Sequence, residues 1–452
     1  MFLIALTTLG MQAMPLRTQA AEAPVPAATG AHPGAVSTLA PGPQRLLLHC
    51  GALVDVRNGR MLGAHTITVT RDRIEAVTPG AATPQSNDQL IDLAGQTCMP
   101  GWIDVHTHLS LRVDAGFYND LLRLNPADHA LRGVDAAGKT LRAGFTTVRN
   151  LGDVDNESLA LRNAVNQGLV EGPRMFTAGR VLSATGGHGD PRNGVSEALM
   201  EAPLPEAGII NSADEAYRAV RQHYKEGADL IKVTVTGGVM SLGKNGDGPQ
   251  LREDEIAAVV KAARDYGLKV AAHAHGTEGI RRSLAAGVDS IEHGTQLDDA
   301  TIATMKRQGT WYVPTLGVLD FIAERSTTFP PVVRAKIQSA NANGHASMER
   351  AQRAGLRIAL GSDAGVLPHG ENAREFTSLV GAGLSPMAAL QAATVNAAAL
   401  LGEDERLGTL EAGKFADVVA VSGDPTVDIS LTRSPSFVMQ GGRVVVAPPA
   451  QR

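Results

Sequence analysis

The chain has 452 residues, with 41 Lys and Arg against 46 Asp and Glu, and its formal net charge is -5. This near-balance gives no field for holding a polyanion, which argues against nucleic acid as a partner. Hydrophobic residues make up 43% and aromatic residues only 4%, so an aliphatic core is expected, which suits an α/β protein. Two cysteines, Cys50 and Cys98, are too few for a disulfide scaffold or a cysteine-rich zinc site.

Residues 1–20 have the features of a signal peptide, although a charged n-region is missing. They contain an apolar stretch too short to span a bilayer and end in Thr18-Gln19-Ala20, a small-x-small pattern. The alternative is a frayed N-terminal tail. Residues 21–44 are rich in Ala, Pro and Gly, which predicts a flexible linker. We therefore expect a periplasmic or secreted protein with no membrane anchor after signal removal.

Both ends of the remaining chain are predicted to be rich in β-strands. The strand-like runs are 46–49, 53–56, 66–70, 73–77, 415–421 and 437–446. Gly441-Gly442 predicts a hairpin turn in the last of them. Because chain ends often lie close together, residues 45–97 and 407–452 are expected to form one small β-sandwich domain.

Between these ends, residues 98–406 alternate between apolar strand-like runs and helical stretches. The predicted strands are 102–108, 145–150, 175–182, 230–235, 269–275, 288–293, 311–315 and 357–363. Helices are predicted at 254–266 and 277–286. Eight βα units over about 300 residues match a (β/α)8 TIM barrel, whose active site lies at the C-terminal ends of its strands.

The first predicted barrel strand closes on His106-Thr107-His108. The period of two residues puts both imidazoles on one face, aimed into the barrel mouth. Neutral imidazole is a good ligand for zinc and its neighbours. An isolated H-x-H pair also occurs on surface strands, so this motif alone is weak evidence for a metal.

Lys232 lies inside an apolar run, where a lysine is almost never buried without a partner. Three interpretations stay open from the residues alone: it snorkels to the strand end, it pairs with an acid, or it is chemically modified. A buried lysine has a depressed pKa. Its neutral amine can then add CO2 and form a carbamate that bridges two metals.

Ligand-type residues also end three later strands. His273 and His275 close the fifth strand, His293 closes the sixth and Asp363 closes the eighth. Each histidine alone could be a hydrogen-bonded core residue, and Asp363 alone could be a helix N-cap. Because strands 1, 4, 5, 6 and 8 all present such a residue at one end, we predict a metal site.

These residues together resemble the two-metal form of the amidohydrolase superfamily, over roughly residues 45–446. The run 100–108 matches its first-strand signature, and 413–419 is similar to its closing segment. The runs 184–189, 236–241 and 291–294 are similar to the imidazolonepropionase-like branch, which holds Xaa-Pro dipeptidases, carboxypeptidase-like enzymes and ochratoxinase. The resemblance implies a hydrolase with two divalent ions, expected to be zinc, and a homo-oligomer.

The resemblance also implies roles for single residues. The metal ligands that it implies are His106, His108, Lys232, His273, His293 and Asp363. Lys232 would be an N6-carboxylysine that bridges both ions, and His106 and His108 would bind the more buried one. Strand alternation cannot separate His273 from His275; the resemblance favours His273 and leaves His275 at the barrel lip.

The implied reaction is hydrolysis of an amide that joins an acyl group to a C-terminal amino acid. A metal-bridging hydroxide attacks the carbonyl, and Asp363 moves its proton to the leaving nitrogen. His188 and the Gly237-Gly238 loop are candidates for gripping the α-carboxylate. The full set of candidate substrate-binding residues is His188, Gly237, Gly238, Val239, Met240 and His275.

We expect the leaving amino acid to be hydrophobic or aromatic. Asp190 and Asp247 are the only acids near the predicted mouth, and both lie among glycines where a solvated turn is the simpler interpretation. Apolar side chains are available at Val239, Met240, Leu242, Leu316, Val318, Leu319, Val366 and Leu367. Amides of the ochratoxin A type fit this expectation by resemblance.

Two other functions remain open. A mononuclear deaminase or a cyclic-amide hydrolase such as imidazolonepropionase would use an acid three residues after the fifth-strand histidine, and Glu278 follows His275 at that spacing. An exposed acid in the first turn of a helix explains Glu278 equally well. A metal-stabilised binding module is the non-enzymatic alternative. Whether Cys50 and Cys98 are bridged stays open, since an exported chain permits a disulfide and buried free thiols are common.

Overall fold

The computed structural model describes residues 45–448, except residues 115, 197, 200–203, 242 and 244. The predicted signal peptide and linker fall on residues 1–44 and so lie outside the described residues. A search of the described helices finds none with the length and apolar character needed to cross a membrane.

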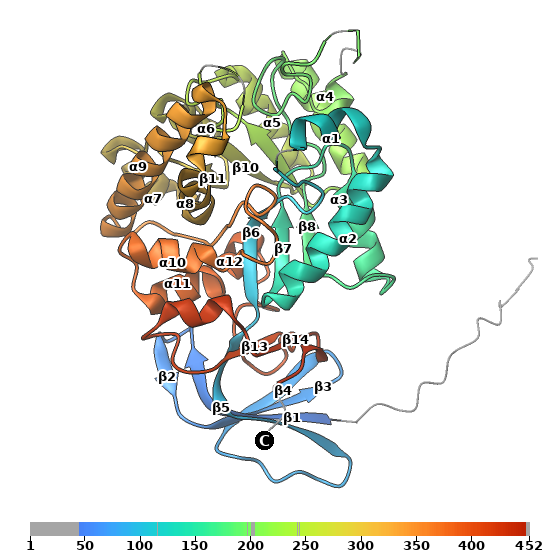
Figure 1. The fold of residues 1–452 in the computed structure, drawn as a ribbon, viewed down its shortest axis with the longest axis vertical. Helices are drawn as coiled ribbons and strands as arrows, with labels where there is room; N and C mark the ends of the chain where they lie inside the picture. The colour runs from blue at the N-terminus through green and yellow to red at the C-terminus, as the bar shows by residue number, and fades with distance from the viewer. Residues whose placement is uncertain are drawn as a thin grey trace, which may run out of the picture. The chain divides into compact units, whose positions relative to one another are not determined.

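Strands from both ends of the chain pair into one eight-stranded sheet (Figure 1). Its strands are β1 (Arg45–Asp55), β2 (Arg60–Leu62), β3 (His65–Thr70), β4 (Arg73–Pro79), β5 (Asp88–Pro100), β13 (Val418–Val421), β14 (Phe437–Gln440) and β15 (Arg443–Val446). The order is β15-β14-β13-β5-β1-β3-β4, with β2 paired to β1. β5 runs parallel to β1 and antiparallel to β13, so it joins the two chain ends into one β layer, as expected.

Two features of this sheet differ from the sequence-based expectation. β1 is one strand with a bulge after Cys50, where two strands were expected, because Gly51 lets the backbone of β5 approach closely. A Cβ atom on Gly51 would lie 1.9 Å from the carbonyl oxygen of Ala94. β5 was not predicted, and it continues through residue 97 to Pro100.

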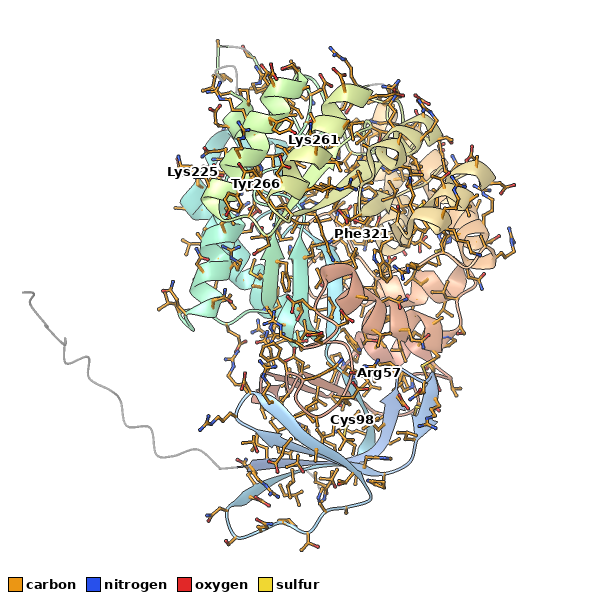
Figure 2. The ribbon with its side chains drawn as sticks, turned by 180° about the vertical axis from the view of Figure 1, so that it is seen from behind. Arg57, Cys98, Lys225, Lys261, Tyr266 and Phe321 are labelled. Carbon is orange, nitrogen blue, oxygen red and sulfur yellow. A yellow bond between two sulfur atoms is a disulfide. The ribbon has the colours of Figure 1, made fainter. Side chains whose placement is uncertain are left out.

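Cys50 and Cys98 form a disulfide, which resolves the question that the sequence left open. It links β1 to β5, and Figure 2 shows Cys98 within the β layer. The two Cα atoms are 5.8 Å apart across the parallel pair. The bond therefore closes a loop with a sequence separation of 48 residues.

The middle of the chain contains two parallel sheets, with orders β6-β7-β8 and β12-β11-β10-β9. Their strands are β6 (Trp102–Thr107), β7 (Phe145–Asn150), β8 (Arg174–Thr177), β9 (Leu230–Thr234), β10 (Lys269–Ala274), β11 (Ser290–His293) and β12 (Trp311–Val313). Every residue of β6, β7 and β9 is buried, as expected for parallel strands covered on both faces.

Short parallel bridges connect these sheets at both edges. Leu182 bridges to Val233 at one edge, and Tyr312 bridges to Ile358 at the other. The predicted eighth strand, 357–363, is not a regular strand, but the segment lies between β12 and β6. The backbone N–H of Val105 donates to the carbonyl oxygen of Leu360, and the backbone N–H of Asp363 donates to the carbonyl oxygen of His106. These contacts place the residue 363 end of this segment beside the end of β6.

Helices alternate with these strands and surround them (Figure 1). They are α1 (Phe117–Arg123), α2 (Pro126–Arg142), α3 (Glu157–Asn166), α4 (Ala213–Glu226), α5 (Glu253–Asp265), α6 (Thr277–Ala286), α7 (Asp299–Gln308), α8 (Leu316–Glu324), α9 (Pro331–Arg353), α10 (Arg374–Gly381), α11 (Pro386–Ala392) and α12 (Val395–Leu401). Local signals set their ends: the Ser212 side chain caps the first turn of α4, and Gly227 ends that helix in the left-handed conformation. The largest buried apolar cluster of the described residues joins strands to helices, and it includes the fully buried Ile231 of β9 and Ile256 of α5.

Candidate active site

The ends of the parallel strands surround a cavity of about 260 Å³. The structure brings all six predicted metal ligands to this cavity: His106, His108, Lys232, His273, His293 and Asp363. Of the predicted substrate-binding residues, His188, Val239, Met240 and His275 also line it. Gly237 and Gly238 are buried in the loop that carries Val239.

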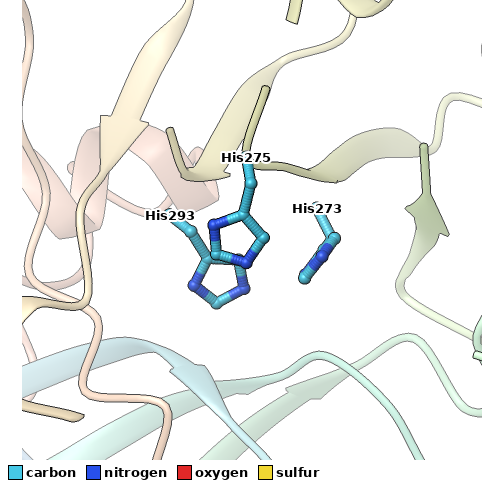
Figure 3. A group of neighbouring side chains, drawn as sticks. All are labelled: His273, His275 and His293. Atoms are coloured by element: carbon cyan, nitrogen blue, oxygen red, sulfur yellow. The ribbon is translucent and has the colours of Figure 1, made fainter. Parts of the chain in front are cut away.

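Three histidine rings from β10 and β11 and the residues that follow them lie together, as Figure 3 shows. The ring centre of His273 is 4.7 Å from that of His275 and 4.6 Å from that of His293. One nitrogen from each of the three rings lies within 4.8 Å of the others, a spacing that can hold a metal ion. The geometry alone therefore does not decide between His273 and His275, in agreement with their shared face on the strand.

A second group with the same spacing is formed by His106, His293 and Asp363. Asp363 Oδ1 lies 3.3 Å from His108 Nε2 and 3.7 Å from His106 Nε2. The two groups share His293, so ligand-type atoms extend continuously from the end of β6 to the end of β10. Each of the two groups has a spacing that can hold a metal ion.

Contacts behind the rings orient these histidines. His106 Nδ1 donates to Glu292 Oε2 at 2.8 Å, and His108 Nδ1 donates to the carbonyl oxygen of Gly152 at 3.1 Å. His293 Nδ1 lies 2.7 Å from the hydroxyl of Thr315. Each contact uses Nδ1 and leaves Nε2 to face the cavity, which is how metal-binding histidines are commonly held.

Four histidines of the cavity, His106, His273, His275 and His293, are neutral near pH 7. Burial lowers the pKa of His106 and of His275 to about 4 and holds the pKa values of His273 and His293 well below the ordinary value. The close contact between His106 and Glu292 is therefore a hydrogen bond from a neutral ring. Neutral imidazole is the form that binds metal ions, so the protein presents ligands that need no deprotonation.

Lys232 ends in the middle of this cluster. Its side chain is 2% exposed, and Nζ lies 3.3 Å from His106 Nε2. Burial lowers the pKa of Lys232 to about 8. A snorkelling lysine would reach water, and among the ion pairs of the described residues none includes Lys232. Its buried position argues against snorkelling, so pairing with an acid and chemical modification stay as the two interpretations.

Strained backbone is concentrated at this site. Among the described residues other than glycine, four have positive φ, and three of them adjoin the cavity: His293 at 68°, Thr315 at 51° and Asp363 at 57°. For a β-branched residue such as Thr315 this conformation is a clear outlier. Such strain persists only where the surrounding structure enforces it, and it is concentrated at functional sites.

Sequence reasoning missed the buried pair of Arg149 and Glu292. Arg149 is 3% exposed, Glu292 is fully buried, and the guanidinium donates to Glu292 Oε1 at 2.8 Å. Burial opposes ionisation of Glu292, but the guanidinium and the hydrogen bond from His106 lower its pKa to about 2. The apolar neighbours that singled out Lys232 in β9 are fewer around Arg149, since β7 contains two threonines and an asparagine.

The walls of the cavity are mainly apolar. Five of the predicted wall residues line it: Val239, Met240, Val318, Leu319 and Val366. Leu316 and Leu367 are instead fully buried in the core, and Leu242 lies outside the described residues. The structure adds Leu111, Val113, Phe117, Val154 and Ile322, which sequence periodicity could not assign to the site because they come from loops and helices.

The acids near the cavity are already engaged. Asp190 accepts hydrogen bonds from Arg192 and from the backbone N–H of Gly186. Asp153, which the sequence did not suggest, accepts from Ser110 Oγ and Asn150 Nδ2. Both carboxylates therefore have partners within the protein, and the preference for a hydrophobic leaving residue stays a prediction.

The rival role for Glu278 is not supported by its position. Glu278 lies in the first turn of α6, and its carboxylate accepts from Arg281 at 2.8 Å and from Arg282 at 2.8 Å. The side chain is exposed and does not line the cavity. It therefore has the features of an ordinary surface acid near a helix N-terminus.

Comparison with known proteins agrees with this geometry. The model of the amidohydrolase family matches residues 97–447. The chain belongs to the amidohydrolase family. This amidohydrolase is 34% identical over 371 residues to the ochratoxinase of Aspergillus niger, a match that covers 77% of this chain and 76% of the relative.

Solved structures of related enzymes are similar to this chain over most of its length. A Xaa-Pro dipeptidase with bound methionine in the active site is 40% identical to this amidohydrolase, with a TM-score of 0.86 over 88% of this chain and 99% of that one. A prolidase complexed with N-methylphosphonate-L-proline is 32% identical, with a TM-score of 0.79 over 89% and 100%. The resemblance found in the sequence motifs is confirmed at the level of the family and of these relatives.

Proposed function

We propose that this amidohydrolase cleaves the amide bond between an acyl group and a C-terminal amino acid with a hydrophobic or aromatic side chain. The observation that carries the proposal is a cavity whose inner end holds the histidine cluster, Lys232 and Asp363 and whose walls are apolar. The relatives support the substrate class, since one holds methionine and another a phosphonate analogue of an acylated proline.

The donor set fits two divalent ions. It offers neutral imidazoles, one carboxylate and a buried lysine, and zinc takes nitrogen and oxygen ligands of these kinds. In the proposal, His106, His108 and Asp363 would hold the more buried ion, His273 and His293 would hold the other, and Lys232 would be shared by both. Lys232 would serve as N6-carboxylysine. When bound, such ions lower the pKa of water and polarise a carbonyl group.

Proton transfer and substrate binding would be carried out by side chains of the protein itself. Burial opposes ionisation of the Asp363 carboxylate, but the hydrogen bond from His108 and the ammonium group of Lys232 lower its pKa. It would accept the proton of the attacking water and deliver it to the leaving nitrogen. His188, the candidate for contacting the α-carboxylate, stacks on His273 with ring centres 4.4 Å apart.

The proposal includes the architecture that was expected. Two parallel sheets with bridges at both edges support a (β/α)8 barrel whose β6-to-β12 seam is filled by residues 357–363. In such barrels the C-terminal strand ends carry the catalytic groups, which is where the cavity lies. Export to the periplasm or medium is proposed on the N-terminal sequence, and a disulfide suits an oxidising compartment.

A substrate panel tests the function. We expect turnover of N-acyl-Phe and N-acyl-Leu, weaker turnover of N-acyl-Pro and N-acyl-Arg, and poor turnover of the matching C-terminal amides. Burying a full apolar side chain contributes about 1.5–3 kcal/mol, which corresponds to at least tenfold in kcat/KM. A tenfold preference for the Arg or Pro compound would overturn the hydrophobic pocket but leave the reaction type intact. A preference for amidated substrates, or release of ammonia from aminopyrimidines or purines, would favour the deaminase alternative.

A further inference from the structure

One lysine far along the chain holds the loop that follows β9. The described residues of the segment 236–250, which exclude 242 and 244, are called here the glycine loop. Thr236 is bridged to Pro249, and the backbone N–H of Gly237 donates to Gly248, so the two ends of the loop lie together after β9. The loop carries Val239, Met240 and Ser241 to the cavity wall. Its shape is therefore part of the active site.

Lys336, on α9, donates to three backbone carbonyl oxygens of this loop. The distances from Nζ are 3.1 Å to Gly238, 2.5 Å to Ser241 and 3.0 Å to Gly243. An ammonium group has three N–H donors, so these contacts use its full capacity. No carboxylate contact to Lys336 occurs among the ion pairs of the described residues, so carbonyl dipoles take the place of a counter-ion.

The loop is shaped to receive this side chain. A Cβ atom on Gly246 would lie 2.6 Å from the Lys336 Cδ atom, so only glycine admits the lysine stem there without displacement. On the opposite side, a Cβ atom on Gly238 would lie 2.3 Å from the ring of His188. The loop backbone is thus held closely between Lys336 and His188.

The clamped segment contacts the catalytic histidines directly. Ser241 Oγ lies 2.5 Å from His188 Nδ1, and His273 Nε2 donates to the carbonyl oxygen of Gly237 at 2.9 Å. The same helix also supports the facing wall, because a Cβ atom on Gly344 of α9 would lie 2.8 Å from Leu319, which lines the cavity. α9 therefore contacts both the glycine loop and the apolar wall of α8.

We propose that Lys336 is a positioning residue that holds the glycine loop against His188 and so sets the width of the cavity between Val239 and Leu319. This proposal rests on the proposed function, because the KM and kcat measurements use acyl amino acids as substrates. Without the clamp, the loop carbonyls return to water, and Ser241 no longer fixes the ring of His188. Substrate binding then weakens more than the chemical step, because Asp363 and His106 are held by contacts outside the loop.

Three variants test the clamp: Lys336→Met, Lys336→Arg and the control Arg353→Met, which lies on the same helix with a side chain that is 67% exposed. Backbone hydrogen exchange in peptides from the glycine loop, metal content and separate kcat and KM values are measured on the full-length protein. In Lys336→Met we expect about tenfold faster exchange in the loop. We also expect KM about tenfold higher, kcat within about threefold and unchanged metal content.

Lys336→Arg should recover part of both effects, because a guanidinium can still donate to the carbonyls, and Arg353→Met should match the wild type. Unchanged loop exchange in Lys336→Met would overturn the proposal. If Lys336→Met does not fold, Lys336→Arg becomes the deciding variant. Its guanidinium cannot reproduce the donor geometry of the ammonium group, so loop exchange and KM equal to those of the wild type would count against the clamp. If the wild type cleaves none of the acyl amino acids, the proposed function fails, while the exchange measurement still decides the role of Lys336.

Discussion

Glu292 Oε2 accepts a hydrogen bond from His106 Nδ1 at 2.8 Å, and this contact determines which nitrogen of His106 faces the cavity. The second oxygen of Glu292 accepts from Arg149 and from Ser290 Oγ, so all of its contacts lie behind the site. The Glu292 carboxylate therefore both orients His106 and pairs with the buried Arg149.

Glu292→Gln should weaken metal binding by about 10–100-fold, because it removes the negative charge that orients His106. It should also lower the melting temperature, since Arg149 would be left buried without its counter-charge, which costs about 3–5 kcal/mol. Chelator competition and thermal unfolding measure the two effects. Glu278→Gln, on the surface, is the matched control and should change neither. Wild-type metal affinity in Glu292→Gln would show that Glu292 does not position His106.

The strand-end residues were predictable because a period of two fixes which side chains share a face. This period pairs His106 with His108 and His273 with His275, and both pairs fall at strand ends that meet at one site. The choice within the second pair was not predictable, since the same period puts both rings on one face, and both do lie within reach of His293. Which one binds metal stays a prediction.

Other parts of the site depend on contacts between distant segments, which a sequence pattern does not contain. β5 was missed because its first half mixes buried Ile91 and Leu93 with exposed residues, and its strand conformation is set by pairing with β1 and β13. The segment 357–363 was expected as a regular strand, but its chain turns at Asp363, where φ is 57°. Lys336 lies about a hundred residues from the loop that it clamps, so no local signal connects them.

The pair of His345 and Asp320 predicts a pH-dependent stability. His345 Nε2 contacts Asp320 Oδ1 at 2.8 Å between α9 and α8, and this hydrogen bond raises the pKa of His345 above its ordinary value of 6.5. Because the folded-state pKa is raised, the stabilisation is fully present below the unfolded value and is lost as pH rises through the folded value. The side chains of Asn341 and Ser378 also donate hydrogen bonds to the Asp320 carboxylate.

The comparison of wild type with His345→Gln tests this pair. The wild type should melt about 1–2 °C higher at about pH 5.5, and the difference should vanish at about pH 8.5. The modest size follows from the partial exposure of both groups. A constant difference at both pH values, or a larger one in alkali, would show that protonation of His345 does not stabilise the fold.

The Cys50–Cys98 disulfide predicts a stability effect confined to the β layer. Opening a loop with a separation of 48 residues should cost about 4 kcal/mol in the chain-entropy description. The double variant Cys50→Ala/Cys98→Ala should therefore melt at a lower temperature, while kcat/KM at about 25 °C stays within about twofold, because neither residue lines the cavity. Thiol titration of the unfolded, unreduced wild type should find no free thiol. Two titratable thiols would show that the bond does not form.

Metal analysis of the wild type and of Lys232→Ala tests whether Lys232 bridges a two-metal site. We expect two divalent ions per chain in the wild type. We also expect loss of metal and of activity in Lys232→Ala, because removal of the bridging group leaves too few ligands for both ions. Short carboxylic acids, which can replace a carbamate, should restore part of the activity. One tightly bound ion per wild-type chain, together with full activity in Lys232→Ala, would contradict the bridged two-metal site.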